Sequence, residues 1–248
     1  MKHLLCAFVL GIFCFDLASA QPAAPQGPHF GGAMNKLFGE HTAFSATLEM
    51  QGKDEKGEMA TIPGKLDVDA GRSRFELDMT QVKPNRVTPA QAAQMKQFGL
   101  DKIVMVDRPD KKVGYMIYAG LQSYVESPLK DRNATAAPDD FKVEITELGK
   151  ETVDGHPCVK SKAVVTDKDG KKSESTIWNA TDLKNFPVRI RSTEGGGEDT
   201  LSFRDITFAK PAASLFEPPT GYTKYDSMMA MMRDQMMKQM GGALPFGR

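Results

Sequence analysis

The feature that most constrains the fold of this sequence is a recurring pattern in which every second residue is apolar. Apolar side chains alternate with polar or small ones in residues 44–50 (FSATLEM) and 74–79 (RFELDM). Because successive side chains of a β-strand point to opposite faces, this period indicates strands with one dry and one wet face. Such alternation is typical of antiparallel sheets, so the pattern predicts one.

Further short strands follow in quick succession, separated by turn residues. Residues 108–110 (RPD), 153–155 (VDG) and 168–170 (KDG) have the chemistry of turns and tight hairpins. A single helical turn, capped by Asn179, is expected before the strand that starts at Pro187. The other expected strands are residues 103–106, 113–118, 121–125, 141–148, 159–165, 173–178 and 201–208. The total is about ten strands with one or two helices, and there is no repeat period.

The last of these strands changes phase. Leu201 and Phe203 keep one alternation, whereas Ile206 and Phe208 keep the opposite one. A bulge near residues 204–205 would return both pairs to the same face, and bulges make sheets curl. The sequence therefore predicts a strongly curved antiparallel sheet.

One internal helix is expected. Residues 88–91 (TPAQ) form a capping box, with Thr at the cap, Pro in the first turn and Gln three positions after the Thr. Gly99 ends the helix. Ala92, Met95 and Phe98 recur every third residue, so we expect this stripe to lie against the sheet.

The first twenty residues have the organisation of a secretory signal peptide. Lys2 gives a basic start, residues 4–15 are apolar, and residues 18–20 (ASA) form a small-residue cleavage site. The apolar run is shorter than the roughly 20 residues of a spanning helix, and Asp16 interrupts it. We therefore expect an exported protein, periplasmic in a bacterium or otherwise extracellular, that is not an integral membrane protein after cleavage.

Composition and motifs exclude several functions. Lys plus Arg equals Asp plus Glu at 32 each, so the basic footprint of a nucleic-acid-binding protein is missing and nucleic acid is not expected as a partner. The sequence has no Gly-x-Ser-x-Gly elbow, no His-Glu-x-x-His pair and no phosphate-binding glycine loop. Signal cleavage would leave Cys158 as the only thiol, and it is interpreted as a small buried strand residue. The sequence therefore predicts no enzyme and no cofactor.

Four segments together carry a resemblance to a known family. They are residues 149–158 (GKETVDGHPC), 177–178 (IW), 186–190 (FPVRI) and 214–222 (SLFEPPTGY). In this order they resemble exported bacterial proteins of domain-of-unknown-function family four-four-one-two, which are similar to the LolA/LolB-like periplasmic lipoprotein carriers. The resemblance is clearest over residues 140–225 and diffuse over 35–130. It implies an unclosed antiparallel barrel with a helix over its mouth, enclosing an apolar cavity that in the carriers accepts acyl chains.

With this resemblance the chain divides into four parts. The fold class expected for the main part is mainly β, with a curved antiparallel sheet that forms an unclosed LolA/LolB-like barrel covered by a helix. The parts are a signal peptide (1–20), a Pro- and Gly-rich flexible leader (21–33), the LolA-like half-barrel domain (34–226) and a Met-rich amphipathic helix or tail (227–248).

Several apolar side chains are candidates for the lining of a ligand cavity, although they would fill a packed core equally well. They are Phe75, Leu77, Trp178, Ile190, Phe203, Leu215 and Phe216. Trp178, the only tryptophan, should be buried either as a core aromatic or in the wall of a lipid cavity. Leu215 and Phe216, followed by Pro218 and Pro219, are interpreted as an apolar plug at the end of the sheet.

Near the C-terminus, residues 228–240 (MMAMMRDQMMKQM) hold seven of the fifteen methionines. On a helix, Met231 and Met237 blur the edges of a methionine stripe that Tyr225 extends backward. The stripe consists of Met228, Met229, Met232, Met236 and Met240. It is expected to dock on the protein's own barrel or on a partner; a Cu(I) site of thioethers and an unpacked tail are the alternatives.

The leading functional hypothesis is a non-enzymatic periplasmic binding protein. Its β half-barrel would hold a hydrophobic ligand, either a lipid or the acyl chain of a lipoprotein. The alternatives are a periplasmic Cu(I)-binding protein that uses the C-terminal methionines, and a ligand-free structural or partner-docking module of the cell envelope. The sequence identifies no protein partner and no oligomeric state.

Overall fold

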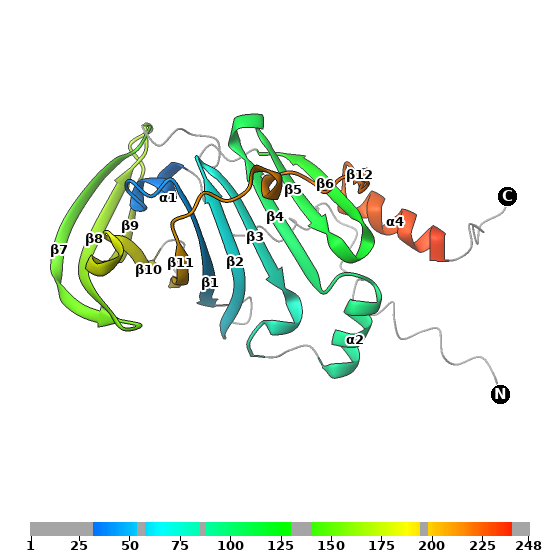
Figure 1. Cartoon of the computed structure of the whole chain (residues 1–248), viewed down its shortest axis with the longest axis horizontal. Helices are drawn as coiled ribbons and strands as arrows, with labels where there is room; N and C mark the ends of the chain where they lie inside the picture. The colour runs from blue at the N-terminus through cyan, green and yellow to red at the C-terminus, as the bar shows by residue number, and fades with distance from the viewer. Residues whose placement is uncertain (1–31, 54–57, 85–87, 130–139, 194–197, 240–248) are drawn as a thin grey trace.

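The chain folds around one large curved β-sheet (Figure 1). A computed structural model describes residues 32–53, 58–84, 88–129, 140–193 and 198–239. Their twelve strands form a single sheet in the order β12-β6-β5-β4-β3-β2-β1-β11-β10-β9-β8-β7. The strands are β1 (Ala43–Lys53), β2 (Met59–Asp69), β3 (Arg72–Asp78), β4 (Lys102–Arg108), β5 (Val113–Tyr118), β6 (Ser123–Pro128), β7 (Lys142–Val153), β8 (His156–Thr166), β9 (Lys172–Ala180), β10 (Phe186–Ser192), β11 (Asp199–Thr207) and β12 (Thr223–Tyr225).

Neighbouring strands are antiparallel, except that the short β12 runs parallel to β6. Helices are few among the described residues. They are α1 (Gly32–Leu37), α2 (Pro89–Gln97) and α4 (Met228–Gln239), with short 3-10 turns η1 (Met79–Gln81), η2 (Pro109–Lys111), η3 (Ala119–Leu121), η5 (Thr181–Leu183) and η7 (Ala213–Phe216).

The alternation in the sequence gives the sheet two different faces. In β3, Phe75 and Leu77 are buried on the inner face, whereas Arg74 and Glu76 point to the outer face and pair with each other at 2.7 Å. The register carries the same phase from strand to strand: Phe75 lies opposite Leu66 of β2. Apolar residues therefore collect on the concave inner face, and most charges lie on the convex outer one.

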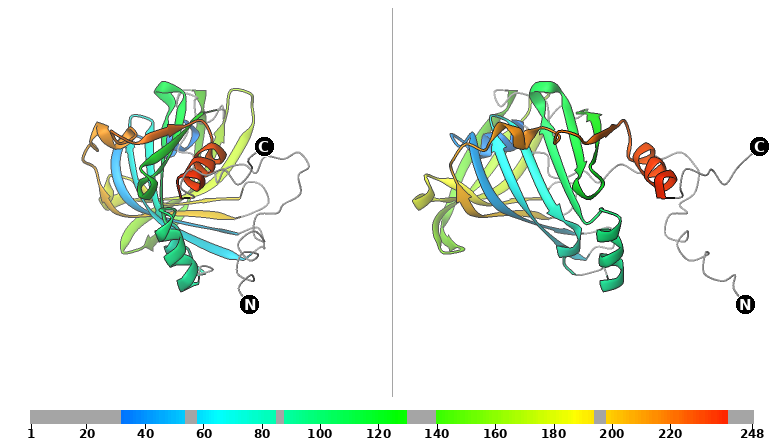
Figure 2. Two further views of the ribbon diagram at one scale, coloured as in Figure 1. Left: turned by 90° about the vertical axis from the view of Figure 1, so that its right-hand side faces the viewer. Right: turned by 45° about the vertical axis from the view of Figure 1, so that its right-hand side comes forward.

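The sheet does not close into a barrel. β12 and β7 are its two edges, and within the described residues these strands do not pair with each other. Figures 1 and 2 show the strands curving along the sheet, with β7 at one end and β12 at the other. The predicted mainly β fold with an unclosed, curved sheet is confirmed.

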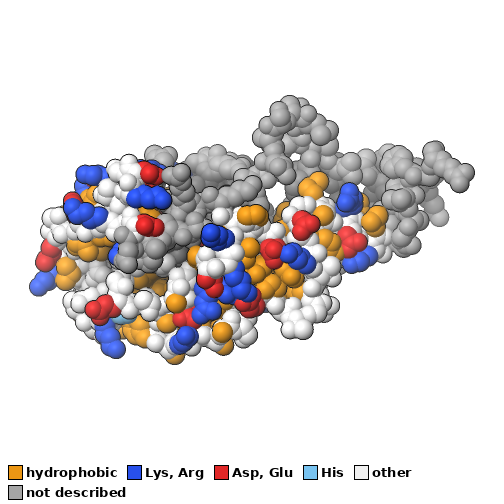
Figure 3. Space-filling model, turned by 90° about the horizontal axis from the view of Figure 1, so that it is seen from above, with side chains coloured by type: hydrophobic (Ala, Val, Ile, Leu, Met, Phe, Trp, Pro, Cys, Tyr) orange, Lys and Arg blue, Asp and Glu red, His pale blue; other side chains and the backbone are white. Residues whose placement is uncertain are grey.

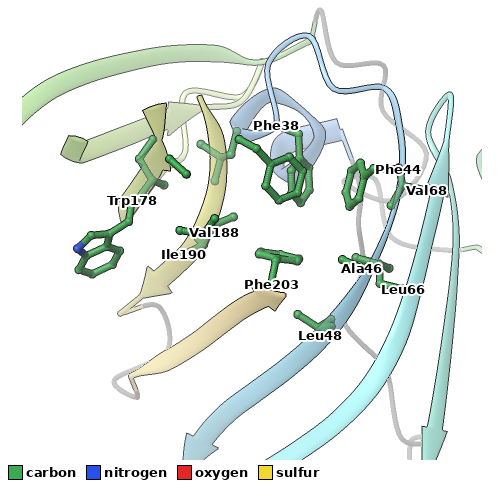
Figure 4. Close-up of a cluster of buried hydrophobic side chains, with 14 of the residues drawn as sticks. Phe38, Phe44, Ala46, Leu48, Leu66, Val68, Trp178, Val188, Ile190 and Phe203 are labelled. Atoms are coloured by element: carbon green, nitrogen blue, oxygen red, sulfur yellow. The ribbon is translucent and has the colours of Figure 1, made fainter. Parts of the chain in front are cut away.

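The larger core lies on the inner face, where α1 and the residue after it cover the sheet. The ring of Phe38 lies 4.9 Å from that of Phe44, 5.5 Å from that of Phe186 and 5.5 Å from that of Phe203, measured between centroids. Figure 4 shows Phe38 pointing from α1 toward β1 and β11. All four rings are buried, and each contributes roughly 1.5–3 kcal/mol of hydrophobic free energy.

A second, smaller core lies on the outer face. The segment of residues 208–222 between β11 and β12, here called the strap, crosses this side of the sheet (Figure 1). Its Phe216 is fully buried against side chains of β4 and β5, which point outward. These side chains are Val104, Val106, Tyr115 and Ile117. One sheet is thus covered on both faces, by α1 on one side and by the strap on the other.

The predicted bulge in β11 is confirmed. The pairing of β1 with β11 shifts between Ser45 and Thr47, and Asp205 has a left-handed backbone with φ of 50°. As a result, Ile206 and Phe208 pack against the same inner core as Phe203. The extra residue corrects the phase and adds curvature.

The predicted helix exists as α2, but its packing differs from the expectation. The capping box between Thr88 and Gln91 is present in both directions, and Gly99 follows the helix with φ of 65°. However, no residue of α2 is fully buried, and its apolar stripe is only half-buried. Figure 1 shows α2 beyond the ends of β3 and β4, so the expectation that it lies against the face of the sheet is wrong.

Other local expectations also need correction. The turn after β9 is the 3-10 turn η5, whose N-cap residue Ala180 makes no side-chain cap, and Asn179 instead donates to the carbonyl of Asn185 at 2.8 Å. One helix and two strands were not predicted: α1, β2 and β12. The signal peptide and most of the leader lie outside the described residues, although α1 already begins at Gly32.

Candidate functional site

The inner face of the sheet holds four of the seven predicted lining residues. Phe75 and Leu77 come from β3, Ile190 from β10 and Phe203 from β11, and all four side chains are at most 8% exposed. The edge of the Phe75 ring covers the Cα of Gly64, because a Cβ at that position would lie 2.4 Å from the Cε2 atom of the ring. These residues form the closed floor of the concave face.

Trp178 is separated from this floor by the sheet itself. It lies next to Ile177 in β9, but its register partners are Arg189 and Lys160, which point to the outer face. Figure 4 shows its indole pointing away from Phe38 and Phe203. The ring centroid lies 5.2 Å from Lys160 Nζ, 5.9 Å from Arg189 Cζ and 5.2 Å from Arg191 Cζ. Trp178 is therefore buried beneath cations on the outer face.

The indole nitrogen of Trp178 also has an anionic partner. It donates to the carboxylate of Glu151 in β7, and this hydrogen bond holds the pKa of Glu151 below its usual value. The bond satisfies the polar edge of the ring, so Trp178 fastens β9 to the edge strand.

Leu215 and Phe216 also lie apart from the concave floor. Both belong to the strap on the outer face, where Phe216 is fully buried and Leu215 is 37% exposed. Phe216 plugs the outer core rather than the interior.

An additional group of inner-face residues was not predicted. They share two properties: each continues the phase of the buried floor, and each is only half-buried. These residues, here called the apolar strip, are Met50, Ile62, Met79, Ile103, Met105 and Leu201. The alternation in the sequence contains the signal for them, since Met50 follows Leu48 and Met79 follows Leu77 at the same period.

The register brings the apolar strip together. Met50 lies opposite Ile62 on one side and Leu201 on the other, Ile103 lies opposite Leu77, and Met105 lies opposite Phe75. The strip thus borders the closed floor without a change of face. Apolar side chains in this part of the concave face remain accessible to water.

The concave face continues onto β5 beyond Met105. Met116 lies opposite Met105, and the hydroxyl of the fully buried Tyr118 donates to the sulfur of Met116 at 2.8 Å. Burial raises the pKa of Tyr118 to about 12, so its phenol stays protonated. This end of the face is neutral and rich in sulfur.

A different place on the molecule brings cysteine and histidine together. An open depression of about 340 Å³ is lined by residues of β7, β8 and η5, and Cys158 is among them. His156 Nδ1 lies 2.8 Å from Asp182 Oδ2, but the thiol of Cys158 donates to the backbone carbonyl of His156 at 3.3 Å rather than to its ring. Burial raises the pKa of the thiol, so the arrangement keeps Cys158 protonated.

The C-terminal methionines form the helix α4, which contacts β12 and β6. Met231, which was expected at the edge of the docking stripe, is the residue that is fully buried. Of the predicted stripe, Met228 is half-buried, Met229, Met232 and Met236 are exposed, and Met240 lies outside the described residues.

The surface charges are mixed in sign. Seen from above, Lys and Arg side chains lie beside Asp and Glu side chains, with hydrophobic side chains between them (Figure 3). The described part of the chain contains no cluster of three or more His, Cys, Asp or Glu side chains that could hold a metal ion. Its helices include none that is long and apolar enough to cross a membrane.

The sequence matches a known family over residues 44–186, described as a domain of unknown function (DUF4412). This match confirms the family resemblance, although residues 187–190 and the segment 214–222 lie beyond the matched residues. No curated protein matches the chain.

The solved structures similar to this chain include those of three proteins. The lipoprotein LppX of Mycobacterium tuberculosis has a TM-score of 0.41 and 12% identity, with 71% of this chain and 93% of that chain covered. The LolA superfamily protein NE2245 of Nitrosomonas europaea has a TM-score of 0.40 and 8% identity, with coverages of 75% and 94%. LprF of Mycobacterium bovis has a TM-score of 0.39 and 14% identity, with coverages of 73% and 96%.

Proposed function

We propose that this chain, which belongs to the DUF4412 family, is a non-enzymatic binding protein that holds a hydrophobic ligand on the concave face of its sheet. The ligand class is a lipid or the acyl chain of a lipoprotein. The ligand lies along the apolar strip and rests against Phe75 and Leu77.

The observation that carries this proposal is the half-exposed state of the apolar strip. Its residues share a face with a buried floor, and Phe38, directly after α1, packs on another part of this face, against Phe44 and Phe203. Each 100 Å² of apolar surface that a ligand covers contributes about 2.5 kcal/mol, at roughly 25 cal/mol per Å². A long, flexible hydrocarbon chain gains most from such a strip, because it contacts several residues at once.

The amino acids of the strip support a ligand of variable shape. Met50, Met79 and Met105 supply three of its six side chains, and Met116 extends the series on β5. Methionine is unbranched and polarisable, so it adapts to irregular partners better than branched residues do. This favours binding of hydrocarbon over recognition of one rigid molecule.

Export is part of the proposal. The basic start, the short apolar run and the small residues at 18–20 favour secretion, and a carrier of acyl chains acts where lipids must cross an aqueous compartment. The protein is accordingly proposed to work in the periplasm of a bacterium or outside the cell.

The test compares two charge substitutions in one strand. Ile62→Glu places a carboxylate in the apolar strip, whereas Met59→Glu places the same charge three residues away in β2, at a side chain that is already 55% exposed. Binding of a fluorescent fatty acid is measured for the unmodified protein and for both variants, and circular dichroism checks that each is folded. Ile62→Glu should abolish binding and Met59→Glu should retain it, because only the first buries a charge against the ligand.

Native mass spectrometry of protein purified from exporting cells, followed by lipid extraction, provides the second arm. Co-purified lipid or uptake of added fatty acid supports the proposal. Protein that neither carries nor takes up an acyl ligand would instead be a ligand-free structural or docking module of the envelope. Binding that is equally strong after Ile62→Glu would show that the ligand does not lie along the apolar strip.

A further inference from the structure

Helix α4 turns most of its thioethers toward solvent. Met229 is 79% exposed, Met236 63% and Met232 38%. Exposure of this kind is unusual for a row of apolar side chains on one short helix, since docking against the sheet would bury them. Packing of α4 on its own domain therefore does not account for these three residues.

The opposite side of α4 holds the helix in place. Met231 is fully buried, Asp234 accepts a hydrogen bond from the hydroxyl of Tyr225, and Ser227 caps the helix by accepting from the amide of Ala230 at 3.1 Å. Tyr225 itself belongs to β12, which is bonded to β6. The exposed row is thus presented by a helix whose orientation is fixed by the sheet.

The spacing of the exposed row places the three methionines on one side of the helix. Met229, Met232 and Met236 follow one another at i, i+3 and i+7, so they lie within about 60° of one another around a helix that turns ~100° per residue. Met232 is a neighbour of both Met229 and Met236, whereas Met229 and Met236 are about 10 Å apart along the axis, so a shared ligand requires the two outer side chains to bend toward Met232. Leucine has a similar helix propensity, so methionine differs from it here by its unbranched side chain and by its sulfur atom.

We propose that Met229, Met232 and Met236 form a binding site for Cu(I), a soft monovalent cation that prefers thioether and thiolate ligands. Binding exchanges the ligands of the incoming ion for three neutral sulfur atoms, with no change in oxidation state and no proton released. The site is separate from the apolar strip and does not depend on lipid binding.

Two of the three charged side chains of α4 lie away from the methionine row, whereas the third, Arg233, lies beside it and its positive charge opposes a bound cation. Lys238 pairs with Asp234 at 2.9 Å, on the side of the helix that faces Tyr225. Arg233 is exposed and lies on the same side as the methionine row. Because thioethers do not titrate, affinity should be the same from about pH 5 to about pH 8, unlike that of a thiolate or imidazole site.

The experiment titrates the full chain with Cu(I) against a competing chelator, and with Ag(I) as a surrogate that does not change oxidation state. We expect about one equivalent to bind, and binding to weaken at least tenfold in a variant that combines Met229→Leu, Met232→Leu and Met236→Leu. The control combines Met59→Leu with Met237→Leu, which changes exposed methionines outside the row and should leave affinity unaltered.

Carbon-13 labelling of the methionine methyl groups identifies the ligands directly. Addition of Ag(I) should shift the signals of Met229, Met232 and Met236 and leave that of Met231 in place. Equal affinity in the triple variant, shifts at other methionines only, or no measurable binding would each overturn the site. Leucine keeps the surface apolar, so a protein-docking role of α4 would survive the triple substitution whereas a copper site would not.

Discussion

The guanidinium carbon of Arg72 lies 5.0 Å from the centre of the Phe216 ring, on the outer face of the sheet. Arg72 starts β3, whereas Phe216 belongs to the strap that leads to the last strand. The contact joins two distant parts of the sequence. It also places an aromatic ring between a cation and the apolar side chains of β4.

The strap should therefore be a main contributor to stability. Phe216→Ala removes a fully buried ring and should lower the free energy of unfolding by about 3–5 kcal/mol. Urea denaturation followed by tryptophan fluorescence measures the loss. Leu215→Ala is the matched control, since its side chain is 37% exposed and should cost about 1 kcal/mol or less. Similar losses for the two variants would show that the strap does not form the outer core.

The strap should also weaken in acid. Burial alone would raise the pKa of Glu217, but hydrogen bonds from Lys111 and Arg108 outweigh it and hold the pKa below the usual 4.5. The hydrogen bond from Arg108 likewise lowers the pKa of Asp110. Carboxylates with lowered pKa values stabilise the folded state above their unfolded-state pKa, and this stability is lost as pH falls through the folded value. We expect the urea midpoint to drop between about pH 5 and pH 3.

A substitution isolates this contribution. Glu217→Gln removes the titrating group, so the midpoint should fall less steeply with acid than in the unmodified protein. Glu40→Gln, at an exposed carboxylate outside the strap, should leave the slope unchanged. If the urea midpoint of Glu217→Gln falls as steeply with decreasing pH as that of the unmodified protein, groups other than Glu217 cause the acid sensitivity.

The floor of the concave face depends on a glycine, Gly64, which has no side chain to displace the Phe75 ring. A Cβ at position 64 would lie 2.4 Å from the Phe75 ring and 2.6 Å from the carbonyl oxygen of Glu76, and the second of these is backbone. Gly64→Ala should therefore destabilise the protein by about 1–3 kcal/mol and push Phe75 toward the apolar strip.

Denaturation and fatty-acid binding together test this effect. Gly114→Ala is the comparison, because the nearest atom to its Cβ would be the end of the Leu129 side chain at 3.3 Å, and the backbone oxygen of Val106 would lie 3.7 Å away. If the two variants have the same free energy of unfolding and the same affinity for fatty acid, that result contradicts the conclusion that Phe75 forms part of the floor against Gly64.

Much of the sheet could be predicted from alternation alone. β5 was predicted with its observed bounds, and the bulge at Asp205 followed from the phase change between Phe203 and Ile206. β2 was missed because Pro63 and Gly64 interrupt its pattern, yet both lie in the antiparallel ladder with β1. β12 is too short to show any period.

The candidate site was harder to predict. Alternation in the sequence shows which side chains of one strand share a face, but it does not show which face points toward the interior. Ile177 and Trp178 are adjacent and both apolar, so the sequence does not indicate which points inward; the cations opposite Trp178 decide it. Phe216 lies in a segment with no period at all. On α4 the spacing of Met229, Met232 and Met236 was visible, but the anchoring residue is Met231, whose burial depends on tertiary contacts.

The gap between the edge strands β12 and β7 has a consequence for the size of the proposed hydrophobic ligand. In a closed barrel, strand number and stagger fix the diameter. This sheet is free of that constraint, because its two margins are not bonded to each other within the described residues. Small changes of twist between neighbouring strands can widen or narrow the concave face while every hydrogen-bonded ladder stays intact, so the proposed ligand can vary in width.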